Sequence, residues 1–147
     1  MIKLISVGKL NQKYLNEGID YYKKQIPIKF EMIEVKDGKD EKALHAEGEA
    51  LLKLLNPSDY VIALAIKGEM FTSEGFAEKI EELLSYHQGD IVFIIGGSHG
   101  LSDAVYERTQ LKISFSKMTF PHQLMRLIFT EQIYRAFMIM KHHPYHK

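Results

Sequence analysis

The chain of 147 residues has no cysteine, no net charge at pH 7 and no apolar run that approaches the length of a membrane span. Without cysteine it forms no disulfides and uses neither thiolate ligands nor a thiol nucleophile, which suits a reducing cytoplasm. Because basic and acidic residues number 19 each, no overall field draws the protein to a polyanion or a membrane. The first ten residues lack the features of a signal peptide. We therefore expect a cytoplasmic protein with one domain, residues 1–147.

Charge and histidine gather at one end of the chain. Residues 115–147 hold five basic side chains and a single acid, Glu131, so this segment carries a net charge of +4 while residues 1–114 carry −4. The same segment holds four of the seven histidines. Any attraction to a polyanion such as RNA is therefore expected to be local.

Apolar periodicity and capping signals make strands and helices alternate along the chain. We predict strands over 2–7, 28–35, 60–66, 91–95 and 111–115, and helices over 11–25, 40–55, 72–86, 102–109 and 122–141. The third and fourth strands are almost continuous apolar runs, as strands covered by helices on both faces must be. The pattern predicts an α/β fold with a mainly parallel sheet sandwiched by helices. The charged stretch 36–42 is expected to be a solvated loop and the start of a helix.

The final helix, over about 122–141, is apolar on every side. At 100° per residue its apolar side chains surround the helical wheel, namely Leu124, Met125, Leu127, Ile128, Phe129, Ile133, Phe137, Met138, Ile139 and Met140. A helix of this kind must be buried on every side. Because a domain of this size covers one side with its sheet, we predict a homodimer with this helix at the interface.

A glycine-rich loop, I-I-G-G-S-H-G at residues 94–100, follows the fourth strand. Glycines directly after a strand allow a ligand to approach the backbone closely, and the most common ligand is a phosphate. The spacing matches neither a P-loop, because the lysine is missing, nor the dinucleotide fingerprint, because residues 116–120 lack the required acid. A tight turn without any ligand stays open as an alternative.

A second unusual loop, S-F-S-K-M-T-F-P-H-Q at residues 114–123, follows the fifth strand. In a parallel sheet, the loops after successive strands meet at the carboxyl edge, where α/β proteins bind ligands. The two loops together predict a slot lined by backbone amides and carbonyls.

Three stretches are similar to one known family. They are V-F-I-I-G-G-S-H-G-L at 92–101, S-F-S-K-M-T-F-P-H-Q-L-M-R at 114–126, and E-Q-I-Y-R-A-F-M-I-M-K-H-H-P-Y-H-K at 131–147. The chain resembles the ribosomal RNA large-subunit methyltransferase H family, small members of the SPOUT, or trefoil-knotted, methyltransferases. The resemblance covers essentially the whole chain. It is most specific from residue 91 onward, and before that it rests on S-V-G-K-L and the length.

The resemblance implies a C-terminal segment that threads through a loop to form a deep trefoil knot, an exception to the rule that chains avoid threading. It also implies a homodimer, S-adenosyl-L-methionine as cofactor, and methylation of N3 of a pseudouridine in 23S rRNA. Because a chain without net charge is expected to bind isolated RNA poorly, the assembled ribosome is the favoured substrate, with isolated RNA as the open alternative. By position, the family's cofactor contacts fall on Leu64, Gly96, Phe115, Ser116, Lys117, Met118, Thr119 and Phe120. Gly96 is expected to matter because a Cβ there would strike the cofactor.

Two side chains of the final helix are candidates for RNA binding or proton transfer. His122 stands at the helix start beside the second loop and can bind substrate or move a proton, with a capping role as the alternative. Arg126 can meet an RNA phosphate or stabilise an imidate, with an ion pair to Glu131 or to a second chain as the alternative. For Arg135, four residues after Glu131, the ion pair is the favoured interpretation.

The C-terminal tail, H-H-P-Y-H-K at residues 142–147, is predicted to capture substrate, and we assign Tyr145 and His146 to the catalytic site. Tyr145 can stack on a base while the histidines and Lys147 meet phosphate. A metal site through His142 and His146 is disfavoured, because Pro144 interrupts the helix between them and no carboxylate is near. We therefore expect no metal. A frayed tail is the remaining alternative.

Two other classes of function stay open. One is a non-catalytic ribosome-assembly or ligand-sensing module that binds S-adenosyl-L-methionine. The other, a flavodoxin-like phosphate binder, is disfavoured because the first turn, residues 8–11, lacks a Ser/Thr-rich phosphate loop. Transfer of a labelled methyl group to RNA separates an enzyme from a binding module.

Overall fold

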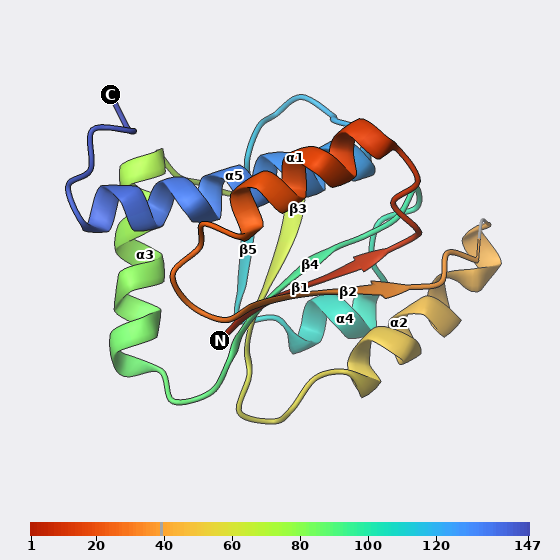
Figure 1. Cartoon of the computed structure of the whole chain (residues 1–147). Helices are drawn as coiled ribbons and strands as arrows, with labels where there is room; N and C mark the ends of the chain where they lie inside the picture. Colours follow the sequence, from red (N-terminus) through yellow and green to blue (C-terminus); the bar gives the residue numbers. More distant parts are fainter. Residues whose placement is uncertain (39) are drawn as a thin grey trace.

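The computed structural model describes residues 1–38 and 40–147, so Lys39, within the charged stretch 36–42, lies outside the described residues. The strands are β1 (Ile2–Val7), β2 (Phe30–Val35), β3 (Tyr60–Met70), β4 (Ile91–Ile95) and β5 (Leu111–Ser114). The helices are α1 (Lys13–Lys23), α2 (Leu44–Lys53) with a 3-10 turn before it (Glu41–Ala43), α3 (Ser73–Tyr86), α4 (Asp103–Arg108) and α5 (His122–Met140) (Figure 1). Apart from the length of β3, each element lies close to its predicted range.

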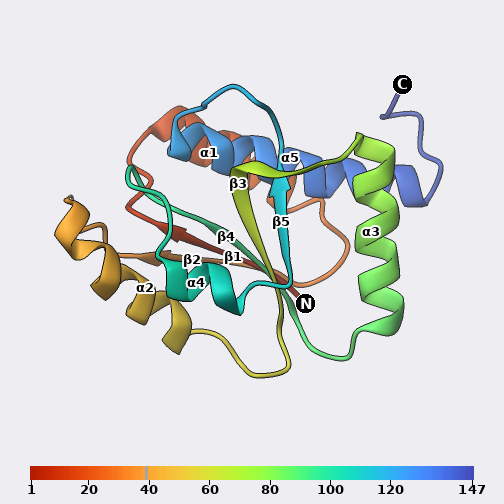
Figure 2. The same cartoon turned by 180° about the vertical axis from the view of Figure 1, so that it is seen from behind.

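The described strands form one sheet in the order β2-β1-β4-β3-β5. Every pairing is parallel: β1 pairs with β2 and β4, and β3 pairs with β4 and β5. Connections through α1 and α3 lead toward the β2 edge over one face, and those through α2 and α4 lead toward the β5 edge over the other (Figures 1 and 2). All four crossovers therefore have the same hand, as parallel sheets require. The predicted parallel α/β sheet is confirmed.

Two apolar cores fill the spaces between the sheet and its helices. Because successive side chains of a strand point to opposite faces, Phe93 of β4 packs with α3 and α5, while Val92 and Ile94 pack with α2 and α4. All residues of β4 are buried. Each large apolar side chain stabilises the fold by about 1.5 to 3 kcal/mol when it leaves water. The buried central strand therefore fixes the position at which the glycine loop begins.

The helix α5 lies on the same face of the sheet as α1 and α3 and packs against both (Figures 1 and 2). Phe129 meets Phe93 of the sheet with ring centroids 4.7 Å apart. A Cβ at Gly18 would come within 3.0 Å of Leu127, so the missing side chain lets α1 approach α5 closely. The helices α1 and α3 of the same chain therefore bury part of the apolar surface of α5. Leu124, on the same helix, stays half-buried.

The strand β3 is longer than predicted, because the chain leaves the ladder with β5 and then returns to it. The sequence predicts an end at Ile66, where polar residues begin, but the strand continues for four residues more. Both Leu64 and Glu69 pair with Ile113, so the intervening residues form a detour. A Cβ at Gly68 would stand 2.7 Å from the backbone of Ile113, so only glycine fits where the detour crosses β5.

Two helices begin at side-chain caps. Thr72 Oγ1 accepts a hydrogen bond from Gly75 N over 2.9 Å at the start of α3, and Ser102 Oγ accepts one from Val105 N over 3.4 Å at the start of α4. A cap of this kind stabilises a helix by about 1 kcal/mol. No helix in the described ranges is long and apolar enough to cross a membrane.

Candidate functional site

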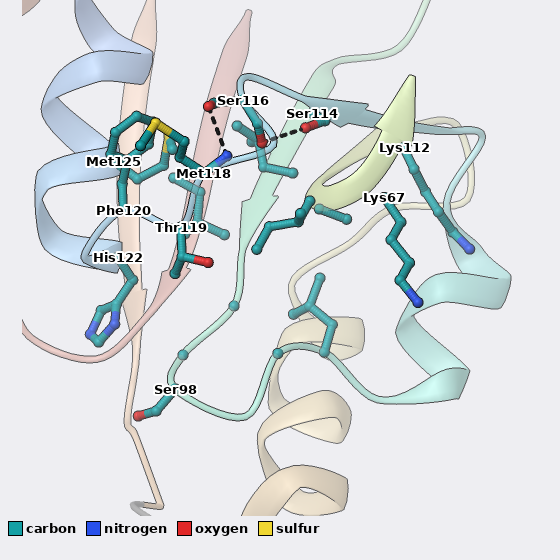
Figure 3. A pocket seen from close by; sticks show the side chains of 18 of the residues that line it. Lys67, Ser98, Lys112, Ser114, Ser116, Met118, Thr119, Phe120, His122 and Met125 are labelled. Atoms are coloured by element: carbon teal, nitrogen blue, oxygen red, sulfur yellow. Dashed lines mark hydrogen bonds between the residues drawn. The ribbon is translucent and has the colours of Figure 1, made fainter. Parts of the chain in front are cut away.

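A cavity of about 560 Å³ opens where β3, β4 and β5 end (Figure 3). Its walls come from the ends of these strands, from the glycine loop (residues 96–100), and from the second loop (residues 115–121) with the start of α5. Open α/β sheets bind ligands at this edge, and the volume lies in the range of small-molecule sites. The predicted slot between the two loops is present as a cavity.

The glycine loop is shaped by its own backbone. Gly100 N donates to Gly97 O over 3.1 Å, which closes a turn, and Gly100 has a φ of +77°, a conformation that glycine adopts readily. A Cβ at Gly96 would stand 2.7 Å from the carbonyl oxygen of Gly100. Gly96 lines the cavity, as predicted, and the absence of a side chain there also leaves room for the return of its own loop. A larger residue at Gly96 would displace the cavity wall itself.

The second loop is anchored by the core and by the hydroxyls of two serines. Ser116 O accepts a hydrogen bond from Ser114 Oγ, and Ser116 Oγ accepts one from Met118 N, each over 2.9 Å. Phe115 turns inward and stacks on Phe129 with ring centroids 6.3 Å apart. Met118, in contrast, is 72% exposed. The loop therefore begins in the core and presents an apolar side chain beside the cavity.

Arg126, on the second turn of α5, is buried with only 1% of its surface exposed. Its Nη1 donates to Glu34 Oε2 over 2.8 Å, and its Nη2 donates to the carbonyls of Val7 and Gly8 over 3.0 and 2.9 Å. Burial lowers the pKa of Arg126, and the carboxylate of Glu34 opposes that shift. This placement corrects the hypothesis that Arg126 meets RNA or an imidate. Its charge is used inside the protein, with Glu34 as partner instead of Glu131, to tie α5 to the end of β1.

The C-terminal tail folds back on α5 and α3. Tyr145 Oη donates to Glu131 Oε1 over 3.0 Å, and the guanidinium of Arg135 lies 4.8 Å from the centroid of the Tyr145 ring. The predicted Arg135–Glu131 ion pair is confirmed, at 2.7 Å. Because arginine only donates, its 3.0 Å contact with His146 Nδ1 leaves His146 Nε2 to donate to Glu74 Oε1 over 2.6 Å. The tail is docked by this network, so the alternative of a frayed tail does not fit the structure.

Burial and hydrogen bonding at the docked tail shift the pKa values of two groups, Tyr145 in the tail and Glu74 on α3. Burial raises the pKa of Tyr145, and its hydrogen bonds with Tyr22 and Glu131 add to the shift, so its hydroxyl stays protonated at neutral pH. The hydrogen bond from His146 lowers the pKa of Glu74. Over the part of the chain that the structure describes, no group of three or more His, Cys, Asp or Glu side chains could hold a metal ion.

Comparison with known families decides the class of protein that this fold and cavity represent. The family described as Predicted SPOUT methyltransferase matches residues 1–146. The chain belongs to the SPOUT methyltransferase family. The resemblance seen in the sequence motifs is confirmed.

Curated relatives and a solved structure agree with the assignment to the SPOUT methyltransferases. The chain is 49% identical to Ribosomal RNA large subunit methyltransferase H of Bacillus pumilus (strain SAFR-032) and 51% identical to the protein of that name from Shouchella clausii (strain KSM-K16). Each comparison covers 99% of both chains. The structure of a probable methylase family protein from Haemophilus influenzae Rd KW20 is similar, with a TM-score of 0.61 over 99% of this chain and 70% of that chain. At 11% identity this likeness shows a shared fold.

Most of the cofactor residues expected for a SPOUT methyltransferase surround the cavity. Six of the eight line it: Leu64, Gly96, Ser116, Met118, Thr119 and Phe120. The other two do not, because Phe115 is packed in the core and Lys117 is exposed elsewhere on the second loop. His122 lines the cavity at the first residue of α5, close to Thr119 and Phe120 (Figure 3).

Within one chain of this SPOUT methyltransferase, the tail does not reach the cavity. Neither Tyr145 nor His146 is among the residues that line it. They contact α5 at Glu131 and Arg135, which lie about 14 and 20 Å along the helix axis from His122. The residues assigned to catalysis from the sequence therefore belong to two separate places in the monomer.

Sequence reasoning missed two cations of the SPOUT cavity, Lys67 and Lys112. Lys67 lies in the detour of β3, directly after the strand end predicted from the sequence. Lys112 is the charged residue of the short strand L-K-I-S, a pattern that is typical of a solvent-facing position. The two lysines share one wall of the cavity because β3 pairs with β5. These strands are not consecutive in the sequence, so no local sequence signal predicts that the lysines lie together.

Proposed function

We propose that this SPOUT methyltransferase transfers a methyl group from S-adenosyl-L-methionine to N3 of a pseudouridine in 23S rRNA, with a ribosomal particle as substrate. The observation that carries the proposal is the cavity of about 560 Å³ between two loops at the carboxyl edge of the sheet. Further support comes from full-length relatives, half identical to this chain, that bear the name Ribosomal RNA large subunit methyltransferase H.

The cavity suits an adenosyl group that binds without a charged partner. In the proposed binding mode, backbone groups of the glycine loop and the second loop meet the hydrogen-bonding edge of adenine, while Leu64 and Phe120 in the cavity wall offer apolar faces for the ring. Met118 can cover the ligand from the opening, since it is exposed there. When bound, S-adenosyl-L-methionine supplies an electrophilic methyl group on a sulfonium, which is an excellent leaving group. The protein's task is therefore to place the acceptor nitrogen against that methyl group.

Proton removal from N3 is the second task, because the imide N–H of the uracil ring is a weak acid. His122 borders the cavity and can accept that proton or hold the base in place. Tyr145 acts as a hydrogen-bond donor instead of a base, since burial raises its pKa. In His146, Nδ1 is used as an acceptor from Arg135, so Nε2 is the atom that faces outward from α5 toward a ligand or Glu74.

A homodimer resolves the separation of tail and cavity in one chain. Two apolar side chains, Ile66 and Met118, are 51% and 72% exposed at the cavity, and Met70 is 54% exposed at the end of β3. Large exposed side chains around an opening are typical of a surface that another chain covers. We therefore include in the proposal that a second copy packs over this rim and α5, so that its tail completes the site.

The deep trefoil knot is part of the same proposal. It is supported by membership of the SPOUT family.

The direct test is methyl transfer to ribosomes from cells that lack this protein. Purified enzyme and S-adenosyl-L-methionine with a labelled methyl group are expected to add one label per 23S rRNA, located by mass spectrometry on N3 of a pseudouridine. Sedimentation at micromolar concentration should give a particle of twice 17.0 kDa.

Other outcomes would reject parts of the proposal. Cofactor binding without any label in RNA would mean a non-catalytic module. Label on another atom or another RNA would support a methyltransferase but reject the proposed substrate. A fully active monomer would reject the proposal that a second copy completes the site.

A further inference from the structure

The walls of the cavity differ in charge. The second loop and the start of α5 present uncharged side chains and His122, whereas the wall formed by β3 and β5 presents Lys67 and Lys112 (Figure 3). Among the described residues that line the cavity, none is Asp or Glu. In a chain without net charge, two ammonium groups on a cavity wall that has no acidic lining residue create a local positive site.

The fold builds this pair through the detour of β3. A Cβ at Gly68 would stand 2.7 Å from backbone atoms of Lys112 and Ile113, so the main chain next to Lys67 lies directly on the main chain that carries Lys112. The strands pair on both sides of the detour, because Ile113 is the partner of Leu64 and of Glu69. Lys67 is therefore held beside Lys112 by backbone pairing and not by a flexible loop.

Neither lysine is neutralised by the protein. No ion pair of Lys67 or Lys112 occurs in residues 1–38 and 40–147. The ammonium of Lys112 lies 4.6 Å from the centroid of the Tyr106 ring, a contact that orients the side chain and leaves its hydrogen-bond donors available. Two exposed, unpaired cations at a cavity are suited to bind an anion.

We propose that Lys67 and Lys112 form a phosphate subsite that holds the RNA backbone beside the nucleotide to be methylated. This inference rests on the proposed function, because it names how that substrate is held. Phosphate contacts position a nucleic acid without reading its sequence, and lysine makes them as a mobile point charge. With the phosphate fixed at the β3–β5 wall, the base is directed toward the opposite wall, where His122 lies.

The charge of the cofactor argues against the other anion available, the methionine carboxylate of S-adenosyl-L-methionine. That molecule carries a sulfonium, an ammonium and one carboxylate, so its net charge is positive at neutral pH. Two lysines that serve it would attract one group and repel two, whereas an RNA backbone presents only negative charge to them. The lysine pair therefore fits the polyanion better.

The test measures binding to purified large ribosomal subunits over a series of salt concentrations. Lys67→Gln and Lys112→Gln should each lower the slope of log affinity against log salt by about 0.7 to 0.9 and, at 0.1 M salt, weaken binding roughly five- to tenfold, because one fewer counterion is released. Calorimetric affinity for S-adenosyl-L-methionine should stay within about twofold. Lys53→Gln, an exposed lysine in the last turn of α2, is the matched control and should change neither quantity.

The results distinguish an RNA phosphate from the cofactor carboxylate as the anion that the lysines bind. Unchanged slopes in both lysine variants would overturn the subsite. Lost affinity for S-adenosyl-L-methionine with an unchanged salt slope would mean that the lysines bind the carboxylate of the cofactor, and would also overturn the phosphate subsite. Lys67→Arg and Lys112→Arg should restore the wild-type slope, and failure to do so would point to a structural role. If the wild-type protein transferred no methyl group, the proposed function would be rejected. The salt slopes of the lysine variants would still show whether the phosphate subsite exists.

Discussion

At its first turns, α5 borders an apolar cavity and sends its only buried cation, Arg126, inward to the backbone of β1. Over its second half, the same helix carries Glu131 and Arg135, which hold the tail through hydrogen bonds, an ion pair and a ring contact. One end thus offers room and apolar surface for a cofactor. The other end offers ordered polar groups without a cavity of comparable size.

In the proposed function, the two ends of α5 have different tasks. Binding an adenosyl group requires space, which the loops at the carboxyl edge provide. Holding the substrate base beside His122 requires side chains with fixed hydrogen bonds, which the tail network provides at Tyr145 and His146. Because a rigid helix separates the two places by about 14 to 20 Å, a second chain is the simplest way to unite them.

The largest expected effect comes from the tail. The double variant Tyr145→Ala, His146→Ala should lower methyl transfer to ribosomes by roughly 100-fold or more, because the hydrogen-bonding groups proposed to position the substrate base are lost. Affinity for S-adenosyl-L-methionine, measured by calorimetry, should stay within about twofold, since neither residue lines the cavity. Equal loss of both quantities would mean that the tail is structural.

A mixture of two inactive variants sharpens this test. Gly96→Val, which displaces the glycine loop, lacks a functional cavity, and the double tail variant lacks the tail. If each tail serves its partner's cavity, subunit exchange should restore about a quarter of wild-type activity, from one intact site in half of the dimers. His99→Ala, exposed in the same loop, is the control for Gly96→Val. A mixture that stays inactive would place each tail at its own cavity.

An intermediate effect is expected when the two arginines of α5 are compared. Arg126→Met should destabilise the protein by about 2 to 3 kcal/mol, because it leaves the buried carbonyls of Val7 and Gly8 without donors. This loss corresponds to a fall in Tm of roughly 5 to 10 °C. Arg135→Met should cost less than about 1 kcal/mol, because its ion pair is partly exposed, yet it should lower methyl transfer by loosening the tail. Unchanged Tm with lost ribosome binding in Arg126→Met would restore an RNA-binding role.

The smallest effect concerns the pH dependence of tail docking. Because the pKa of Glu74 is lowered by its hydrogen bond from His146, the contact contributes above the ordinary carboxyl pKa of 4.5 and is lost as the pH falls through the lower, folded value. An NMR titration of the Glu74 carboxyl should therefore have its midpoint below 4.5, and His146→Ala should return it toward 4.5. The resonance of Glu78, exposed on the same helix, should not respond to that substitution. A midpoint indifferent to His146→Ala would show that the tail is not docked there in solution.

Much of the fold could be predicted because its signals are local. The apolar run of β4 indicates a strand covered on both faces, and the four-residue spacing of Glu131 and Arg135 predicts their ion pair on a helix. Contacts between distant residues could not be predicted in this way. Arg126 and Glu34 are 92 positions apart, and their pairing depends on the place of α5 beside β1 and β2.

The candidate site follows the same division. Its two loops are visible as glycines and irregular sequence after strands, and most of the residues expected at the cavity line it. The contact that a side chain at Gly96 would make with Gly100 could not be predicted, because the return path of the loop is a three-dimensional property. Lys67 and Lys112 escape a sequence search since a detour in β3 brings them together.

The sequence by itself determined the alternation of strands and helices, the parallel sheet, the two loops at its carboxyl edge and the SPOUT family, because periodicity and motifs are properties of neighbouring residues. Only the tertiary structure decided that Arg126 is buried, that the tail is docked away from the cavity, and that two lysines share a wall. Those outcomes depend on which strands become neighbours and on which charged groups find partners when water is excluded.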